Sequence, residues 1–206
     1  QTAHGGNCMI KTVFFDMADV LSNGWEEMKA EICSVLGLSP EELMEAIERF
    51  KPLLGIGRIP FSDFAVEIGK RKGLNAKQVM RVWKNAFNAH MHKRREVWEL
   101  ARALKAHCRV GILSNTHEFH AALYREKGFY GEFDPVILSC ETGVRKPDAR
   151  MFSIALEKAG CTARECAFID NRMENVQAAN AFGFKGIVFR DATQVKRELE
   201  ALGVNV

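Results

Sequence analysis

Short apolar runs alternate with amphipathic segments along most of the chain. The first run, residues 10–15, is rich in β-branched and aromatic side chains and ends at Asp16. Continuous apolar runs of this length are typical of strands buried on both faces of a parallel sheet. Ligands of such sheets bind outside the carboxyl ends of the strands. Asp16 is therefore predicted at the edge where a reacting group would stand.

Strand and helix patterns alternate from residue 96 to the end of the chain. Further strands are predicted at 109–113, 136–139, 167–169 and 186–189. Amphipathic helices are predicted at 96–106, from 117, at 148–159, from 174 to 183 and from about 193. Such alternation is typical of an α/β fold, in which a parallel sheet carries helices on both faces.

The segment between residues 22 and 95 is helical in pattern and contains no strand-like run. Ser39 and Glu42 have the spacing of a capping box at the start of one helix. Ser62 is predicted to cap a second helix, which ends at Gly73, and a third amphipathic segment follows. We expect these helices to form a small bundle that packs on itself.

An insertion of this length after the first strand predicts two domains. The helical one would form a cap over the active edge of the sheet, connected through hinge segments at 22–24 and 91–94. The first eight residues show no periodicity and are interpreted as an extension outside the fold. The predicted division is 9–21 with 95–206 for the core and 22–94 for the helical cap.

The composition is that of an ordinary globular protein. The chain has 206 residues, 47% hydrophobic and 27% charged, enough for one core and a modest accessory lobe. A formal net charge of +3 is too small to indicate a nucleic-acid partner. No run of about 18 apolar residues is present to span a bilayer, and the N-terminal segment lacks the apolar middle of a secretory signal. Six scattered cysteines without a CxxC pair predict reduced thiols, so we expect a cytoplasmic protein without membrane partners.

Three further segments place polar side chains where predicted strands or loops end. VGILSNT contains Ser114 and Asn115, GVRKPD contains Lys146, and CAFIDN contains Asp170 and Asn171. Taken singly, each is typical of a turn or a helix cap. Because the strands of a parallel sheet end at one edge, together they indicate a single site.

In this order, Asp16, Ser114, Lys146 and Asp170 resemble the four signature motifs of the haloacid dehalogenase-like hydrolase superfamily. The resemblance extends over residues 10–189 and is most specific in SCETGVRKPDARMF and FIDNRMENVQAANAFGF. Within this superfamily, the chain resembles the subgroup with a helical cap inserted after the first motif. The resemblance implies a Rossmann-like core and, usually, a magnesium-dependent phosphatase with an aspartyl nucleophile.

The resemblance also implies a role for each residue of the site. Asp16 would attack phosphorus and form an aspartyl phosphate, and Ser114 with the neighbouring backbone N–H groups would hold a phosphoryl oxygen. Lys146 would add a fixed positive charge and orient Asp16. Ser114, Asn115, Lys146 and Asp19 are the predicted substrate-binding residues.

Two positions depart from the pattern of the family phosphatases. A second Asp usually stands two residues after the nucleophile as general acid and base, but this chain has Ala18, whose methyl group transfers no proton. Asp19 substitutes for it only if the loop turns, because neighbouring side chains of an extended segment point in opposite directions. The implied Mg²⁺ ligands are Asp16, the Ala18 main-chain carbonyl, Asp170 and Asn171. The neutral amide of Asn171 predicts a weaker attraction for the ion.

Three functions follow from these observations. A phosphatase for a small phosphorylated molecule ranks first. The second is a 2-haloacid dehalogenase-type hydrolase in which Asp16 displaces halide without a metal, a reaction compatible with Ala18 and Asn171. The third is a catalytically impaired relative that binds a ligand in the same cleft. No feature of the sequence indicates an oligomeric state.

Residues near the predicted site also have plain structural interpretations. His117 and His120 share one helical face, a spacing that two metal ligands use, but the sequence pairs no third ligand with them. Trp25 follows the nucleophile loop and is the tryptophan expected to line the pocket. Candidates for a second anionic group of the substrate are Arg49, Lys51 and Arg58.

Overall fold

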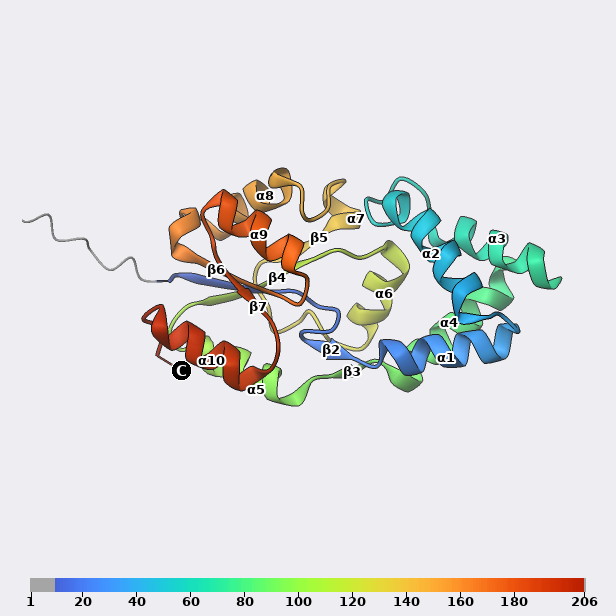
Figure 1. Cartoon of the computed structure of the whole chain (residues 1–206), viewed down its shortest axis with the longest axis horizontal. Helices are drawn as coiled ribbons and strands as arrows, with labels where there is room; N and C mark the ends of the chain where they lie inside the picture. The colour runs from blue at the N-terminus through green and yellow to red at the C-terminus, as the bar shows by residue number, and fades with distance from the viewer. Residues whose placement is uncertain (1–9, 206) are drawn as a thin grey trace, which may run out of the picture.

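A five-stranded parallel sheet forms the centre of the molecule, for which the computed structural model describes residues 10–205. Its strands are β1 (Thr12–Phe15), β4 (Arg109–Ser114), β5 (Val136–Leu138), β6 (Cys166–Asp170) and β7 (Lys185–Val188). They lie in the order β5-β4-β1-β6-β7, with β1 in the middle (Figure 1). All five correspond to predicted strands. The predicted extension over residues 1–8, and Met9, lie outside the described residues.

Helices cover both faces of the sheet, as predicted (Figure 1). Side chains of β1 alternate between them: Val13 and Phe15 belong to one apolar cluster, and Phe14 belongs to the other. Since all four residues of β1 are buried, the strand reads as an unbroken apolar run. The helices of the core are α5 (Arg95–Leu104), α6 (Glu118–Glu126), α7 (Ser139–Thr142), α8 (Ala149–Ala159), α9 (Met173–Phe182) and α10 (Ala192–Ala201), with a 3₁₀ turn, η1, at Ala163–Glu165.

Four helices between β1 and β4 form a separate layer beyond one end of the sheet (Figure 1). They are α1 (Trp25–Leu36), α2 (Pro40–Leu54), α3 (Phe61–Lys72) and α4 (Ala76–His90), and we call them the helical insert. Helix α4 packs against both α1 and α3, so the bundle has an apolar interior of its own. At the start of α2, Ser39 and Glu42 form the predicted capping box in both directions.

The start of α3 differs from the prediction. Pro60 precedes the helix, and Ser62 lies inside the first turn without making a cap hydrogen bond. The Phe61 main-chain N–H donates instead to Glu118 Oε1 of α6, at 2.5 Å. A core residue thus replaces the local cap, and a contact between residues 57 positions apart leaves no trace in the local pattern.

Two short strands connect the helical insert to the core. β2 (Ser22–Asn23) pairs antiparallel with β3 (His92–Lys93). The prediction that no strand lies between residues 22 and 95 is therefore wrong, because two-residue strands are too short to produce a periodic pattern. Both strands fall within the segments predicted as hinges. Gly24 next to β2 has φ 104°, and a Cβ there would meet the His90 carbonyl oxygen at 1.9 Å, so only glycine fits.

A second contact holds the helical insert against the core. In the loop between α2 and α3, Gly57 packs so closely that a Cβ would meet the Cys140 carbonyl oxygen at 2.4 Å. The Phe61 ring stacks on His117 and Phe119, with centroids 4.8 and 4.7 Å apart. The insert therefore touches the core on two sides of the strand ends rather than only at the hinge.

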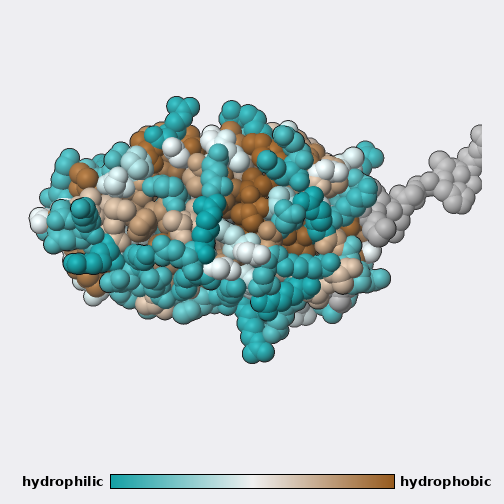
Figure 2. All heavy atoms as spheres, turned by 180° about the vertical axis from the view of Figure 1, so that it is seen from behind, coloured by the Kyte–Doolittle hydropathy of each residue, from teal (hydrophilic) through white to brown (hydrophobic). Residues whose placement is uncertain are grey.

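Hydrophilic side chains cover most of the face seen from behind, and hydrophobic surface is confined to patches between them (Figure 2). The large apolar side chains that are exposed, Val35, Leu53, Val66 and Met173, come from several different helices. No helix within residues 10–205 combines the length and apolar character needed to cross a membrane. The five cysteines in this range are free thiols.

Candidate active site

The strand register brings two carboxylates to one level of the sheet edge. Phe15, the last residue of β1, is paired with Ile169 of β6, and the Asp16 N–H donates to the Ile169 carbonyl at 2.8 Å. Asp16 and Asp170 therefore leave neighbouring strands at the same height. Adjacent strands lie about 4.8 Å apart, so one cation between the carboxylates can contact both.

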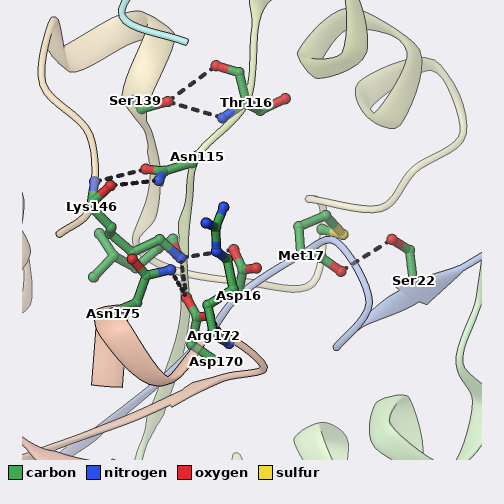
Figure 3. Close-up of polar contacts among 11 residues, drawn as sticks. Asp16, Met17, Ser22, Asn115, Thr116, Ser139, Lys146, Asp170, Arg172 and Asn175 are labelled. Carbon is green, nitrogen blue, oxygen red and sulfur yellow. Dashed lines mark hydrogen bonds and ion pairs between the residues drawn. The ribbon is translucent and has the colours of Figure 1, made fainter. Parts of the chain in front are cut away.

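The Lys146 side chain occupies this position (Figure 3). Its Nζ donates to Asp16 Oδ1 at 2.8 Å, to Asp170 Oδ2 at 2.7 Å and to the Leu113 carbonyl at 2.6 Å. Only 1% of Lys146 is exposed, and the three acceptors use all three donors of the ammonium group. The cation is therefore fixed in place, and it fixes the direction of the Asp16 carboxylate.

Side-chain hydrogen bonds anchor the loop that follows β4 (Figure 3). Asn115 Nδ2 donates to the Lys146 carbonyl at 2.9 Å, and the Lys146 N–H donates to Asn115 Oδ1 at 2.8 Å. Ser139 Oγ accepts from Thr116 N and donates to Thr116 O. The amide of Asn115, predicted to bind substrate, is thus bound to the main chain of Lys146, and its observed contribution is to position that residue. Ser114, the last residue of β4, is buried and lines the cavity described below.

Asp170 is completely buried and accepts hydrogen bonds on both oxygens (Figure 3). Besides Lys146, the donors are the Arg172 N–H at 2.8 Å and Asn175 Nδ2 at 2.9 Å. Asn175 was not among the residues predicted from the sequence. Its position on the helix could have identified it. Asn175 lies on the buried face of α9 together with Ala179, and a buried polar side chain needs a hydrogen-bond partner.

The pKa of Asp16 is raised to about 6, chiefly by burial, while Lys146 opposes this rise and the Asp170 charge adds to it. The carboxyl group is therefore ionised at neutral pH and protonated in mild acid. An ionised oxygen is what attack on phosphorus requires.

The loop after β1 turns sharply. Asp19 has φ 61°, a left-handed conformation that is uncommon for a residue other than glycine. Behind it, Ser22 donates its N–H and its hydroxyl to the Met17 carbonyl, at 2.9 and 3.1 Å. As a result Ala18 and Asp19 both line the cavity. The loop therefore turns at Asp19, as its predicted role requires, and that role stays a prediction.

The donors available for a metal ion are oxygens, which suits Mg²⁺. They are the Asp16 carboxylate, the Ala18 carbonyl and the exposed Asn171 amide, whereas the Asp170 oxygens already accept from three N–H groups. Within residues 10–205, no group of three or more His, Cys, Asp or Glu side chains is arranged to hold a metal. The residues fit Mg²⁺ with a single uncommitted carboxylate oxygen, Asp16 Oδ2, and the assignment of the four predicted ligands stays a prediction.

A cavity of about 290 Å³ opens where the helical insert meets the core. The core contributes Ser114, Asn115, Thr116 and residues 17–19 to its lining. Trp25 lines it as predicted, and so does Lys51, whereas Arg49 pairs with Glu67 at 2.6 Å. Aromatic and aliphatic side chains of the insert make up much of the remaining wall: Met44, Ile47, Leu54, Phe61, Phe64 and Trp83.

His117 and His120 also line this cavity, in a neutral state. Trp83 Nε1 donates to His120 Nε2 at 2.7 Å, and because an indole nitrogen only donates, Nε2 must be an acceptor. His117 Nδ1 likewise accepts from the His120 N–H at the start of α6. Burial lowers the pKa of both rings, that of His120 to about 3. The shared spacing of the two histidines thus serves helix capping and packing.

Comparison with known proteins agrees with this arrangement. Over nearly its whole length the chain is similar to the sesquiterpene phosphatase astK of Aspergillus oryzae, with 27% identity covering 93% of this chain and 96% of that protein. Its fold is similar to two solved structures. The HAD family enzyme BT-2542 of Bacteroides thetaiotaomicron, in complex with magnesium and inorganic phosphate, has a TM-score of 0.74 at 22% identity, covering 88% and 94% of the two chains. The L-2-haloacid dehalogenase of Xanthobacter autotrophicus has a TM-score of 0.64 at 23% identity, covering 94% and 83%.

The family model for haloacid dehalogenase-like hydrolases matches residues 10–183, which include β1, the helical insert, the strand ends that hold Asp16 and Asp170, and the loop before α8 that holds Lys146. The match covers well over half of the chain and agrees with the motif order and the sheet topology. This protein belongs to the haloacid dehalogenase-like hydrolases.

Proposed function

We propose that this hydrolase is a magnesium-dependent phosphomonoesterase that acts on a small phosphorylated molecule through an aspartyl-phosphate intermediate. The observation that carries the proposal is the buried ammonium of Lys146, bound to Asp16 and Asp170 beside a cavity at the sheet edge. The phosphatase name of the Aspergillus oryzae relative, which aligns over nearly the whole chain, supports the same chemistry.

In the first step, a carboxylate oxygen of Asp16 forms a bond to phosphorus while the bond between phosphorus and the substrate alcohol breaks. Ser114 and the N–H groups of its loop hold the phosphoryl oxygens, and Lys146 keeps Asp16 aligned and offsets negative charge. A bound Mg²⁺, held by Asp16, the Ala18 carbonyl and Asn171, would add positive charge next to the phosphoryl group.

The leaving alkoxide needs a proton, and we propose that Asp19 supplies it. The left-handed turn brings Asp19 to the rim of the cavity, where partial desolvation raises its pKa against an opposing effect of Arg94, although part of the side chain is exposed. A raised pKa favours a carboxyl group that holds a proton until the leaving oxygen takes it. The Asp19 carboxylate then accepts a proton from the attacking water. That water forms the new bond to phosphorus, the bond to Asp16 breaks, and inorganic phosphate leaves.

The helical insert has the role of a cap in this proposal, and residues 9–21 and 95–206 form the catalytic core. The antiparallel pair of β2 and β3 would be the hinge. Side chains of the insert reach the cavity wall but not the Lys146 cluster. We therefore assign the chemistry to the core and the choice of substrate to the insert.

A carbon–halogen hydrolase is the second candidate, and Ala18 is the observation that favours it. Halide leaves carbon without a proton, so a reaction of this kind needs no acid at position 18. The ester formed between Asp16 and the substrate carbon would then be hydrolysed by water.

Turnover of p-nitrophenyl phosphate and of ethyl phosphate, with Mg²⁺ and with EDTA, tests the proposal. Asp16→Asn should lower both rates at least about a thousandfold. Asp19→Asn should lower ethyl phosphate turnover by about 10²-fold or more and p-nitrophenyl phosphate turnover far less, because nitrophenolate leaves without a proton. Asp63→Asn, an exposed acid on α3, is the control and should change neither rate.

A readout independent of turnover is thermal stability, since a ligand that binds the folded state raises the melting temperature. Mg²⁺ should raise that of the wild type and not that of Asp16→Asn. Equal rates for wild type and Asp16→Asn would refute the nucleophile. Metal-independent halide release from 2-chloropropionate would favour the second candidate, and inactivity toward every substrate would favour a ligand-binding relative.

A further inference from the structure

The wall that the helical insert contributes to the cavity is made of hydrocarbon and aromatic groups. Six of its side chains are Trp25, Met44, Ile47, Leu54, Phe64 and Trp83. The two charged side chains of α2 that reach the lining, Glu48 and Lys51, are paired with each other at 2.8 Å. A substrate group that lies along this wall therefore meets an apolar surface.

Polar groups of α6, next to this wall, are already hydrogen-bonded within the protein. Trp83 Nε1 and His120 Nε2 bind each other, and the Tyr124 hydroxyl binds Ser22 Oγ at 2.9 Å. His117 stacks face to face on Phe61, with an interplanar angle of 7°. A sugar or a polar head group placed against these groups would lose hydrogen bonds to water and find few free partners in return, which disfavours its binding.

The cavity is too large for a phosphoryl group alone. Its volume of about 290 Å³ compares with about 10–15 Å³ for one water-sized site, so it has room for on the order of twenty water molecules. Its lining continues from this wall to Ser114 and to residues 17–19, next to Asp16. A phosphoryl group at Asp16 would therefore place its alcohol portion within this cavity.

We propose, on the basis of the phosphatase function above, that the substrate is the phosphate monoester of a long apolar alcohol whose hydrocarbon body fills the cavity between the helical insert and the core. The core edge binds the phosphoryl end, and the insert selects the body by apolar contact.

Binding of linear alkyl phosphonates tests the apolar body without requiring hydrolysis, because their C–P bond is not cleaved by phosphate ester chemistry. Calorimetry with the Mg²⁺-loaded protein should show affinity rising about two- to fourfold with each added methylene from ethyl to octyl phosphonate. An affinity that does not change with chain length would overturn the proposal.

A matched pair of methionines locates the binding surface. Met44 and Met80 are both half-buried on helices of the insert, but only Met44 lines the cavity. Met44→Gln keeps the side-chain length and introduces an amide, and it should lower octyl phosphonate affinity about tenfold or more while leaving ethyl phosphonate affinity within twofold. Met80→Gln should leave both affinities unchanged. Equal effects of the two substitutions would contradict the assigned surface.

Turnover of octyl phosphate, glycerol 3-phosphate and p-nitrophenyl phosphate separates this proposal from the function on which it rests. A chain-length effect on phosphonate binding together with preferred turnover of octyl phosphate supports both. The same binding without any turnover supports the apolar body and refutes the phosphatase. Preferred turnover of glycerol 3-phosphate, with flat phosphonate binding, overturns the apolar body and leaves the phosphatase intact.

Discussion

The core edge and the wall of the helical insert line one cavity but are built by opposite means. At the core edge, Lys146, Asp16 and Asp170 are buried charges, each held by hydrogen bonds of defined direction. At the insert wall, most groups are aromatic or aliphatic, and burial keeps His120 of α6 neutral while Trp83 donates a hydrogen bond to it. Charged groups held at fixed positions by the strand register can act on the same phosphoryl group in every substrate. Apolar packing at the wall, in contrast, can favour one substrate body over another. Changes at the core should therefore affect every substrate equally, and changes at the wall should affect substrates according to their shape.

The largest effect should come from removing the cation at the core edge. Lys146→Met leaves the Asp16 and Asp170 carboxylates buried beside each other without a counter-charge. We expect the free energy of unfolding in urea at pH 8 to fall by about 3–5 kcal/mol. Activity toward every substrate should be lost as well.

A matched control for that substitution is Lys51→Met. Lys51 pairs with Glu48 on the insert, where Lys51 is half-buried and Glu48 is exposed, and pairs open to solvent contribute about 0–1 kcal/mol. A loss below 1 kcal/mol for Lys146→Met, like that of the control, would show that the core edge does not depend on its buried charges. The comparison between the two regions would then fail.

The second largest effect is a change of folding stability with pH that comes from the raised pKa of Asp16. It is measured in EDTA so that no metal ion is bound. Burial raises the pKa from 3.8 to about 6, so between these values the folded state holds a proton that the unfolded state has released. Folding stability therefore decreases as pH rises through this window, and the full loss, about 2–3 kcal/mol, is present above pH 6. Asn resembles the protonated acid, so Asp16→Asn should be more stable than the wild type by about this amount at pH 8 and equal to it near pH 4.

Thermal unfolding of both proteins from pH 4 to pH 8 measures this difference. The control is Asp63→Asn, an exposed position on α3, whose stability should stay within about 1 kcal/mol of the wild type at every pH. If the Asp16→Asn protein were less stable than the wild type at pH 8, the ion pair with Lys146 would outweigh burial. The ionised Asp16 carboxylate would then stabilise the folded state rather than destabilise it.

The core was predictable from the sequence because its information is local. The β1 run ends at Asp16, and the rule that strand ends gather at one sheet edge brings Asp16, Ser114 and Asp170 together before any distance is known. Lys146 comes from a loop before a helix, which the family motif order adds to the site. The sequence did not show how Lys146 is held there. Its carbonyl and N–H bind Asn115, 31 residues away, and this pairing depends on the relative height of two loops.

The helices of the insert could be predicted from the sequence, but the contacts by which they line the cavity could not. Periodicity locates the apolar face of α4, yet it does not show that Trp83 on this face would donate to His120 of the core helix α6. The same limit explains the error at Ser62, where Glu118 of the core replaces the expected cap. Local patterns define elements, whereas contacts between elements depend on packing that no single segment encodes.

The smallest expected effect on stability comes from removing one tryptophan hydrogen bond in each region. Trp83 Nε1 donates to His120 Nε2 in the insert wall, and Trp98 Nε1 donates to the Leu21 carbonyl in the core. Replacing either by Phe should lower the free energy of unfolding at pH 8 by about 1 kcal/mol for the hydrogen bond, in addition to the packing lost with the larger ring.

Only the Trp83→Phe deficit should depend on pH. In the wild type the folded pKa of His120 is lowered to about 3, so stability decreases as pH falls below the unfolded value of 6.5. Without the Trp83 donor, Nε2 is free to take a proton, the folded pKa rises and this decrease becomes smaller. The deficit of Trp83→Phe relative to the wild type should therefore shrink between pH 8 and pH 5, while that of Trp98→Phe, whose acceptor does not titrate, should stay constant. If the stability deficits of the two variants changed with pH in the same way, the indole N–H of Trp83 would not contribute to keeping His120 neutral. The insert wall would then tolerate a charged group as the core edge does.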